Sequence, residues 1–70
     1  MYKTQFGERL RELRTERGFG VIQFSKLLGV SHSTISRWEN GLQEPDFYYA
    51  IEVAKFFGVS LDFLAGLSEY

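Results

Sequence analysis

The sequence predicts an all-α domain made of five short helices. Apolar residues recur three and four positions apart along most of the chain, which is the spacing of one helix face. Glycines follow these segments, where helices commonly end. The one proline lies between segments, and no useful stretch alternates apolar and polar residues as a strand does. A chain of 70 residues has room for one domain, so we expect residues 1–70 to fold as a single unit.

The first helix is expected from about Thr4 to Arg17. Its apolar stripe has the spacing i, i+4 and i+7, and consists of Phe6, Leu10 and Leu13. Thr4 is expected to cap the start, and Gly18 to end the helix in the left-handed conformation.

The next two helices are expected to form a helix-turn-helix over residues 21–40. The second helix covers Val21–Leu28, with Gly20 as its N-cap and an apolar side of Phe24, Leu27 and Leu28. The segment Gly29-Val30-Ser31 is a short turn, and Ser31 caps a third helix that runs from His32 to about Asn40.

Two further helices are expected in the C-terminal part. Pro45 followed by Asp46 predicts the start of a helix that runs to about Phe57. Its inward stripe is expected to contain Phe47, Ala50, Ile51, Ala54 and Phe57. A last helix, capped by Ser60, covers Leu61–Ala65.

The composition argues against several classes of protein. Cysteine is absent and histidine occurs once, so we expect no disulfide, no metal site and no cofactor. The N-terminus becomes charged early and apolar runs are short, so we expect no signal peptide, no membrane span and a cytoplasmic location. His32 has no partner that would make it a catalytic base, and Glu8, Glu12 and Glu16 alternate with arginines as on a solvated face. We therefore expect no enzyme.

Charge is distributed unevenly along a chain whose net charge is −1. Residues 1–40 carry seven cationic and four acidic side chains, a net of +3, whereas residues 41–70 carry one and five, a net of −4. Such asymmetry indicates that one part of the surface faces phosphates and another part faces something else.

The expected third helix has two unlike faces. Ile35 and Trp38 are three apart and form an apolar face that anchors it. The other face has short polar side chains, one arginine and no carboxylate, and consists of His32, Ser33, Ser36, Arg37 and Asn40. A helix that enters the major groove of DNA needs such donors and acceptors. The alternative is an ordinary solvated face, but such faces usually mix Glu and Lys.

Five segments of the chain match a known family in order and spacing. They are Phe6-Gly-Glu-Arg-Leu-Arg-Glu-Leu-Arg, Leu28-Gly-Val-Ser, Ser33-Thr-Ile-Ser-Arg-Trp-Glu-Asn-Gly, Glu44-Pro-Asp and Gly58-Val-Ser-Leu-Asp-Phe-Leu. In these segments residues 6–66 resemble the lambda-repressor-like (Cro/XRE) helix-turn-helix family. The resemblance implies a compact five-helix domain that binds double-stranded DNA through its third helix.

The resemblance also implies roles for individual residues. Base contacts fall on His32, Ser33, Ser36 and Arg37, while Thr34 and Asn40 fall where phosphate contacts are common, and Ser36 also falls where a thymine methyl is met. Arg14 and Glu39 match an ion pair between the first and third helices, in which Glu39 is structural and Arg14 also faces the DNA backbone. The alternative for these two residues is that they are unrelated surface charges.

The sequence departs from the family at the start of the second helix and after the third. Gly20 and Val21 replace the usual Ser/Thr cap and Gln, so only backbone amides are left to meet a phosphate there. The loop after Gly41, often basic, is Leu42-Gln43-Glu44. We therefore expect a shallow salt dependence of DNA binding. Val21 and Ile22 are open to three interpretations: contact with a thymine methyl, packing on Phe19, or contact with another partner.

An aromatic surface in the C-terminal half is the expected dimer interface, and it consists of Tyr48, Tyr49, Phe56, Phe63 and Tyr70. The alternative is that these rings fold over the small core. The sequence thus predicts a homodimeric transcriptional regulator, of the repressor type, that reads a short palindromic operator. The alternative function is a protein-interaction module on the same scaffold, such as an antitoxin or the partner of an anti-repressor.

Overall fold

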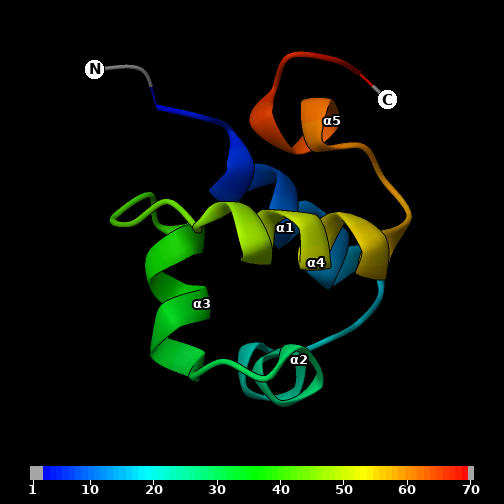
Figure 1. Ribbon diagram of the computed structural model, residues 1–70. Helices are drawn as coiled ribbons and strands as arrows, with labels where there is room; N and C mark the ends of the chain where they lie inside the picture. Colours follow the sequence, from blue (N-terminus) through cyan, green and yellow to red (C-terminus); the bar gives the residue numbers. More distant parts are fainter. Residues whose placement is uncertain (1–2, 70) are drawn as a thin grey trace.

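The computed structural model describes residues 3–69 and contains the five predicted helices (Figure 1). They are α1 (Phe6–Glu16), α2 (Val21–Leu28), α3 (His32–Glu39), α4 (Phe47–Phe57) and α5 (Leu61–Ala65). No strand occurs within residues 3–69. The predicted all-α class is confirmed, and α2 and α3 form the predicted helix-turn-helix.

Side chains cap three of the helices at their first turn. Ser31, Asp46 and Ser60 accept hydrogen bonds from the backbone amides of Thr34, Tyr49 and Phe63, at 3.2, 2.9 and 2.9 Å. Such caps satisfy amides that have no partner inside the helix. The predicted caps Ser31 and Ser60 are confirmed.

The predicted cap of the first helix is wrong. Gln5 is the N-cap residue of α1 and its side chain accepts no capping hydrogen bond. The hydroxyl of Thr4, one residue earlier, accepts from the amide of Phe6 at 3.3 Å and donates to Glu44 at 2.6 Å. Thr4 therefore ties the start of the chain to the loop that precedes α4.

Every helix is followed by a glycine with a positive φ between 68° and 85°. This agrees with the sequence-based endings, including that at Gly18. The core lies between the helices and consists of Phe6, Leu10, Phe24, Ile35, Trp38, Val53, Ala54, Phe57 and Leu64.

Two residues expected to point inward are exposed. Phe47, the first residue of α4, is 72% exposed, and Leu27 of α2 is 53% exposed. Val53 is fully buried in α4 although the predicted stripe omitted it. The buried side of α4 is thus rotated toward Val53, Ala54 and Phe57.

The helices are arranged so that α2 and α5 lie at opposite ends of the molecule, with α4 crossing between them (Figure 1). α3 packs against α2 and α1, and α5 packs against α1 and α4. Gly7 allows the close approach of α1 and α3, because a Cβ at this position would overlap the carbonyl oxygen of Trp38. None of the described helices has both the length and the apolar character needed to cross a bilayer.

Candidate nucleic-acid interface

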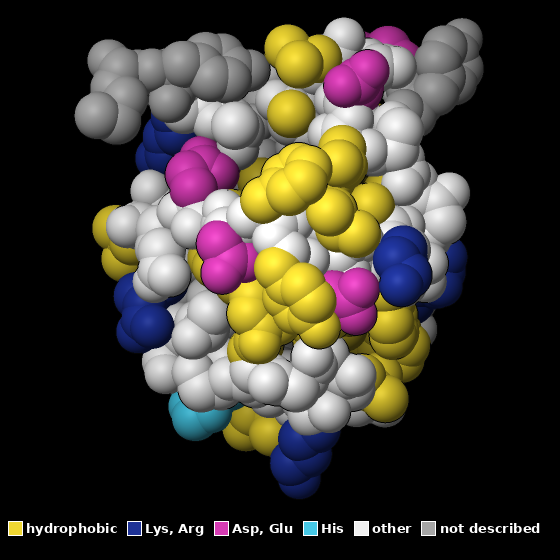
Figure 2. All heavy atoms as spheres, in the orientation of Figure 1, with side chains coloured by type: hydrophobic (Ala, Val, Ile, Leu, Met, Phe, Trp, Pro, Cys, Tyr) yellow, Lys and Arg dark blue, Asp and Glu magenta, His cyan; other side chains and the backbone are white. Residues whose placement is uncertain are grey.

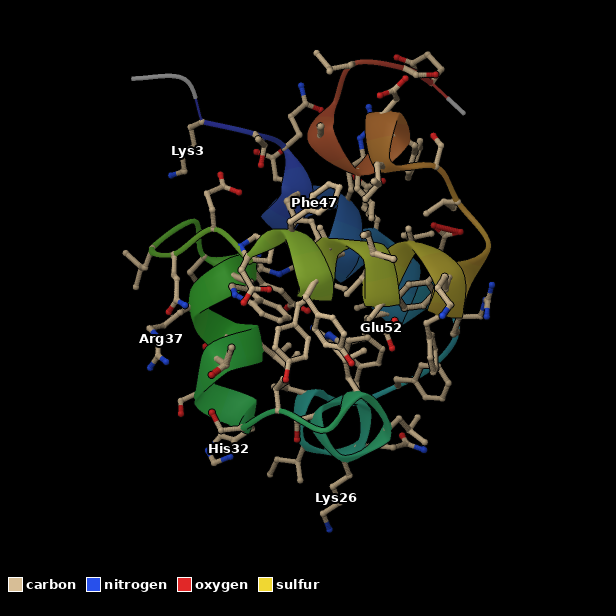
Figure 3. All side chains as sticks on the ribbon, in the orientation of Figure 1. Lys3, Lys26, His32, Arg37, Phe47 and Glu52 are labelled. Atoms are coloured by element: carbon tan, nitrogen blue, oxygen red, sulfur yellow. The ribbon has the colours of Figure 1, made fainter. Side chains whose placement is uncertain are left out.

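α3 has the two faces predicted for it. Ile35 and Trp38 are buried in the core, whereas the polar side chains of the other face are exposed, and these are His32, Ser33, Ser36, Arg37 and Asn40. Figure 3 shows His32 at the start of α3 and Arg37 projecting from the helix away from the body of the molecule. The exposed face therefore has several donors and acceptors, and among its described residues no carboxylate.

The start of α3 is held by a small hydroxyl network. Ser31 Oγ and Thr34 Oγ1 lie 2.9 Å apart, in addition to the capping bond from the Thr34 amide. Thr34 Oγ1 also accepts from Arg37 Nη2 at 3.4 Å. Thr34, the predicted phosphate contact, is half-buried and already engaged within the protein.

Arg14 and Glu39 form the predicted ion pair, and it joins α1 to α3. Arg14 Nε and Nη2 donate to the two carboxylate oxygens of Glu39 at 2.6 and 2.8 Å. The side chains are only 10% and 3% exposed. The hydrogen bond with Glu39 raises the pKa of Arg14 above its ordinary value, although burial opposes the shift.

The same geometry argues against the phosphate contact predicted for Arg14. Its Nη1 donates to the carbonyl oxygen of Phe19 at 2.7 Å, so all three guanidinium nitrogens have partners within the protein. With its side chain only 10% exposed and each nitrogen engaged, the Arg14 guanidinium offers little surface to a phosphate. Arg14 is therefore a structural residue that also fixes the chain entering α2.

Arg11 is a residue of this site that the sequence analysis missed. Its Nε lies 3.3 Å from Glu39 Oε1, and its Nη2 donates to Asn40 Oδ1 at 2.9 Å. Its side chain is 50% exposed. Asn40 in turn donates from Nδ2 to Ser36 Oγ at 3.3 Å. Arg11 stands one turn of α1 before Arg14, and that spacing is the signal that would have pointed to it.

Lys3 brings a second cation to the same end of α3. Its side chain lies over Gly41, where a Cβ would fall 2.5 Å from the Lys3 Nζ atom. Figure 3 shows Lys3 on the same side of the molecule as Arg37. The described cations Lys3 and Arg11 thus flank Asn40 where α3 ends.

The start of α2 offers backbone rather than side-chain groups. Gly20 is the exposed N-cap residue of α2, and it makes no side-chain capping hydrogen bond. Val21 is half-buried and packs against the core, as Phe19 does. Ile22 is exposed.

The predicted aromatic surface is divided by the fold. Tyr49, Phe56 and Phe63 pack against the core, and only Tyr48 of the described members is largely exposed, at 61%. Tyr70 lies outside the described residues. The interpretation that the rings fold over the core is therefore correct for Tyr49, Phe56 and Phe63.

A different apolar surface is present at the start of α4. Phe47 is exposed there and lines a groove of about 340 Å³, whose other lining residues are mainly apolar and include Phe6, Pro45, Ala50, Leu61 and Leu64. Tyr48, the next residue of α4, is also exposed. Figure 2 shows hydrophobic side chains gathered over this part of the molecule, with acidic side chains among them. We refer to Phe47, Tyr48 and this groove as the α4 surface.

Comparison with known proteins places this geometry in a family. A helix-turn-helix family model matches residues 10–64. The chain is 36% identical over 59 residues to the SPbeta prophage-derived HTH-type transcriptional regulator YonR of Bacillus subtilis, and the match covers 84% of this chain and 55% of YonR. It is 33% identical over 64 residues to the cryptic phage CTXphi transcriptional repressor RstR of Vibrio cholerae, covering 91% of this chain and 58% of RstR.

A solved structure agrees with the sequence matches. The P22 c2 repressor protein in complex with a synthetic operator superposes with a TM-score of 0.82 at 30% identity, covering 90% of this chain and 96% of the repressor chain. The chain spans little more than half the length of YonR and RstR. By its family model, its helix arrangement and these relatives, the chain belongs to the lambda-repressor-like (Cro/XRE) helix-turn-helix family.

Proposed function

We propose that this chain is the DNA-binding domain of a transcriptional regulator, of the repressor type, that reads a short palindromic operator in double-stranded DNA. The observation that carries the proposal is the exposed, carboxylate-free polar face of α3, supported from behind by buried Ile35 and Trp38. A rigid helix with such a face suits the major groove. The P22 c2 repressor, which shares the fold, is described in complex with an operator, and this supports the proposal.

Roles are assigned to two groups of residues. His32, Ser33, Ser36 and Arg37 contact bases. Phosphates are met by the backbone amides at Gly20 and Val21, by Thr34 and Asn40, and by Lys3 and Arg11 in place of Arg14. The domain acts by binding, without catalysis, and in the cytoplasm.

Selection of duplexes from a random DNA pool tests this function. The wild-type domain is expected to enrich a palindromic consensus, and Arg37→Ala to relax it at one symmetric position, because Arg reads guanine through two hydrogen bonds. Lys55→Ala is the matched control, since Lys55 is an exposed cation on α4 and its loss should leave the consensus unchanged. If the wild-type protein enriches no sequence, the proposal fails and the protein-interaction module becomes the better explanation.

We assign homodimer formation to the α4 surface instead of the aromatic set predicted from the sequence. Phe47 exposes a large apolar side chain at an apolar groove, Tyr48 next to it in the chain is also exposed, and exposed apolar surface of this kind commonly marks an interface. Half-sites lie about 34–36 Å apart, and this domain measures 28 × 25 × 19 Å, so adjacent copies fit neighbouring half-sites.

Sedimentation equilibrium of the wild-type protein and of Phe47→Asp tests the dimer. The substitution is expected to weaken self-association and to remove cooperative binding to a two-half-site duplex. Leu67→Asp, an equally exposed apolar position after α5, is the control. A wild-type protein that stays monomeric at high micromolar concentration, both free and on DNA, would contradict the assignment.

A further inference from the structure

The loop after α3 brings the side chain of Gln43 against Arg37. Arg37 Nε donates a hydrogen bond to Gln43 Oε1 at 2.9 Å. Arg37 Nη2 donates to Thr34 Oγ1 at 3.4 Å. Both residues of the Arg37–Gln43 pair are exposed, so nothing in the core requires this contact.

The backbone of the loop fixes where Gln43 stands. Gly41 has a φ of 72°, its amide donates to the carbonyl of Trp38 at 3.1 Å, and the amide of Leu42 donates to the carbonyl of Arg37 at 2.9 Å. These two bonds form a Schellman motif, which turns the chain sharply back on the end of a helix. The loop that carries Gln43 is thus anchored to the backbone of Arg37, whose side chain Gln43 also binds.

These contacts leave one edge of the guanidinium available. Arginine has five donors in a fixed planar fork. Gln43 takes the donor on Nε, and Thr34 takes one on Nη2. Among the described residues, Nη1 and the second donor of Nη2 have no partner, and they form the end of the fork. Two adjacent donors match the two acceptors O6 and N7 of guanine in the major groove.

We propose that Gln43 is a positioning residue that holds the Arg37 guanidinium with its Nη1/Nη2 edge toward a guanine. This inference rests on the proposed DNA-binding function and adds a specificity determinant outside α3. A free arginine side chain loses rotamer freedom when it binds. Holding the side chain beforehand reduces that loss and fixes the orientation in which the base is read.

The effect on specificity separates positioning from direct contact. A residue that positions Arg37 affects the same base pair as Arg37 and has no effect once Arg37 is gone. A phosphate contact lowers affinity uniformly across sequences, and an independent base contact affects a different base pair.

The test measures dissociation constants for the duplex selected by the wild-type protein and for its three single-base-pair variants at the position that Arg37→Ala relaxes. Gln43→Met keeps the length of the side chain and removes the acceptor. It is expected to reduce discrimination at that position by about 2- to 10-fold, the range for one hydrogen bond. In the Arg37→Ala background the same change is expected to have no further effect.

Two further variants complete the design. Gln43→Glu keeps an acceptor for Nε, so it is expected to retain discrimination at that position while overall affinity falls through repulsion of phosphates. Leu42→Ala is the control for the loop, because the Leu42 side chain is exposed and has no polar group with which to hold Arg37. Circular dichroism of each variant checks that the fold is intact.

The outcomes distinguish a failure of the positioning role of Gln43 from a failure of DNA binding. If Gln43→Met leaves discrimination intact, lowers affinity uniformly, or affects another base pair, the positioning role is wrong while DNA binding stands. If Arg37→Ala relaxes no position, the role is also wrong. If the wild-type protein selects no sequence, the proposed function itself fails.

Discussion

Arg14 and Glu39 show how a buried charge pair is made tolerable. Moving two charges out of water is costly, and the cost is offset only when geometry is good and the other polar atoms also have partners. Here the pair is bidentate, Phe19 supplies an acceptor for Nη1, and Arg11 supplies a second cation for Glu39. The Arg14–Glu39 pair thus joins three segments of the fold, which are α1, α3 and the chain at Phe19 that enters α2.

Glu39→Ala is expected to be strongly destabilising. It leaves the Arg14 guanidinium buried without its counter-charge, a change that typically costs roughly 3–5 kcal/mol. A core of this size rarely supplies more than about 3–5 kcal/mol, so much of the variant should be unfolded at room temperature. Urea denaturation followed by circular dichroism measures the change in the free energy of unfolding.

Two control variants test whether the loss of stability comes from the unpaired buried charge. Glu12→Ala removes an exposed carboxylate from α1 and should change stability by less than about 0.5 kcal/mol. The double change Arg14→Leu with Glu39→Leu removes both charges and should recover much of the loss, because no unpaired charge remains. Equal stability of Glu39→Ala and Glu12→Ala would show that the pair has no structural role.

At the scale of elements, the helices could be predicted from the sequence better than their faces. α2 and α5 have the predicted bounds because local signals set them: a cap such as Ser60 and a terminal glycine. Burial depends on which elements pack against a helix, and that information is not local. Phe47 fits the apolar spacing of α4 but stands at its first turn, where the side chain lies largely exposed.

The candidate DNA-binding site likewise has one part that the local sequence predicts and another part that depends on contacts between elements. The polar face of α3 follows from its own sequence. Arg11 meets Glu39 only because α1 and α3 approach closely, and Gln43 meets Arg37 only because the loop folds back. The Arg14–Glu39 pair was predicted through family resemblance, since residues 25 apart carry no local signal of contact.

Gly7→Ala tests the close approach of α1 and α3. Within an isolated helix, alanine is favoured over glycine by up to about 1 kcal/mol. In the folded domain the added Cβ overlaps the Trp38 carbonyl, so α1 must shift away from α3. Overpacking of this kind typically costs about 1–3 kcal/mol. A lower midpoint of thermal or urea unfolding is therefore expected.

Gly20→Ser is the control for Gly7→Ala. A Cβ at Gly20 meets no atom within 4 Å, and serine is a better N-cap than glycine by a few tenths of a kcal/mol. This variant is expected to be slightly more stable than the wild type. If Gly7→Ala were also stabilising, local helix propensity would outweigh the contact, and the α1–α3 approach would be looser than described.

For the molecule as a whole, charge and apolar surface are separated. The cations of residues 1–40 include Lys3 and Arg11 beside the end of α3, while the exposed apolar residues Phe47 and Tyr48 stand on α4 within the acidic half. One domain therefore offers two distinct surfaces, and we propose that one meets phosphates and the other a second copy. Because few cations flank α3, binding to DNA should depend strongly on the pairing of two domains.

The salt dependence of binding measures the number of these phosphate contacts. The slope of log affinity against log salt is about −0.9 for each phosphate neutralised, so Lys3 and Arg11 alone predict about −2 per domain. Leu42→Lys adds a cation to the exposed loop after α3 and should make the slope steeper by about 1. Leu67→Lys makes the same charge change after α5, at the end of the molecule opposite α2, and should leave the slope nearly unchanged. Fluorescence anisotropy over a salt series gives all three slopes, and a wild-type slope typical of six to ten contacts per domain would show that cations outside this site meet the DNA backbone.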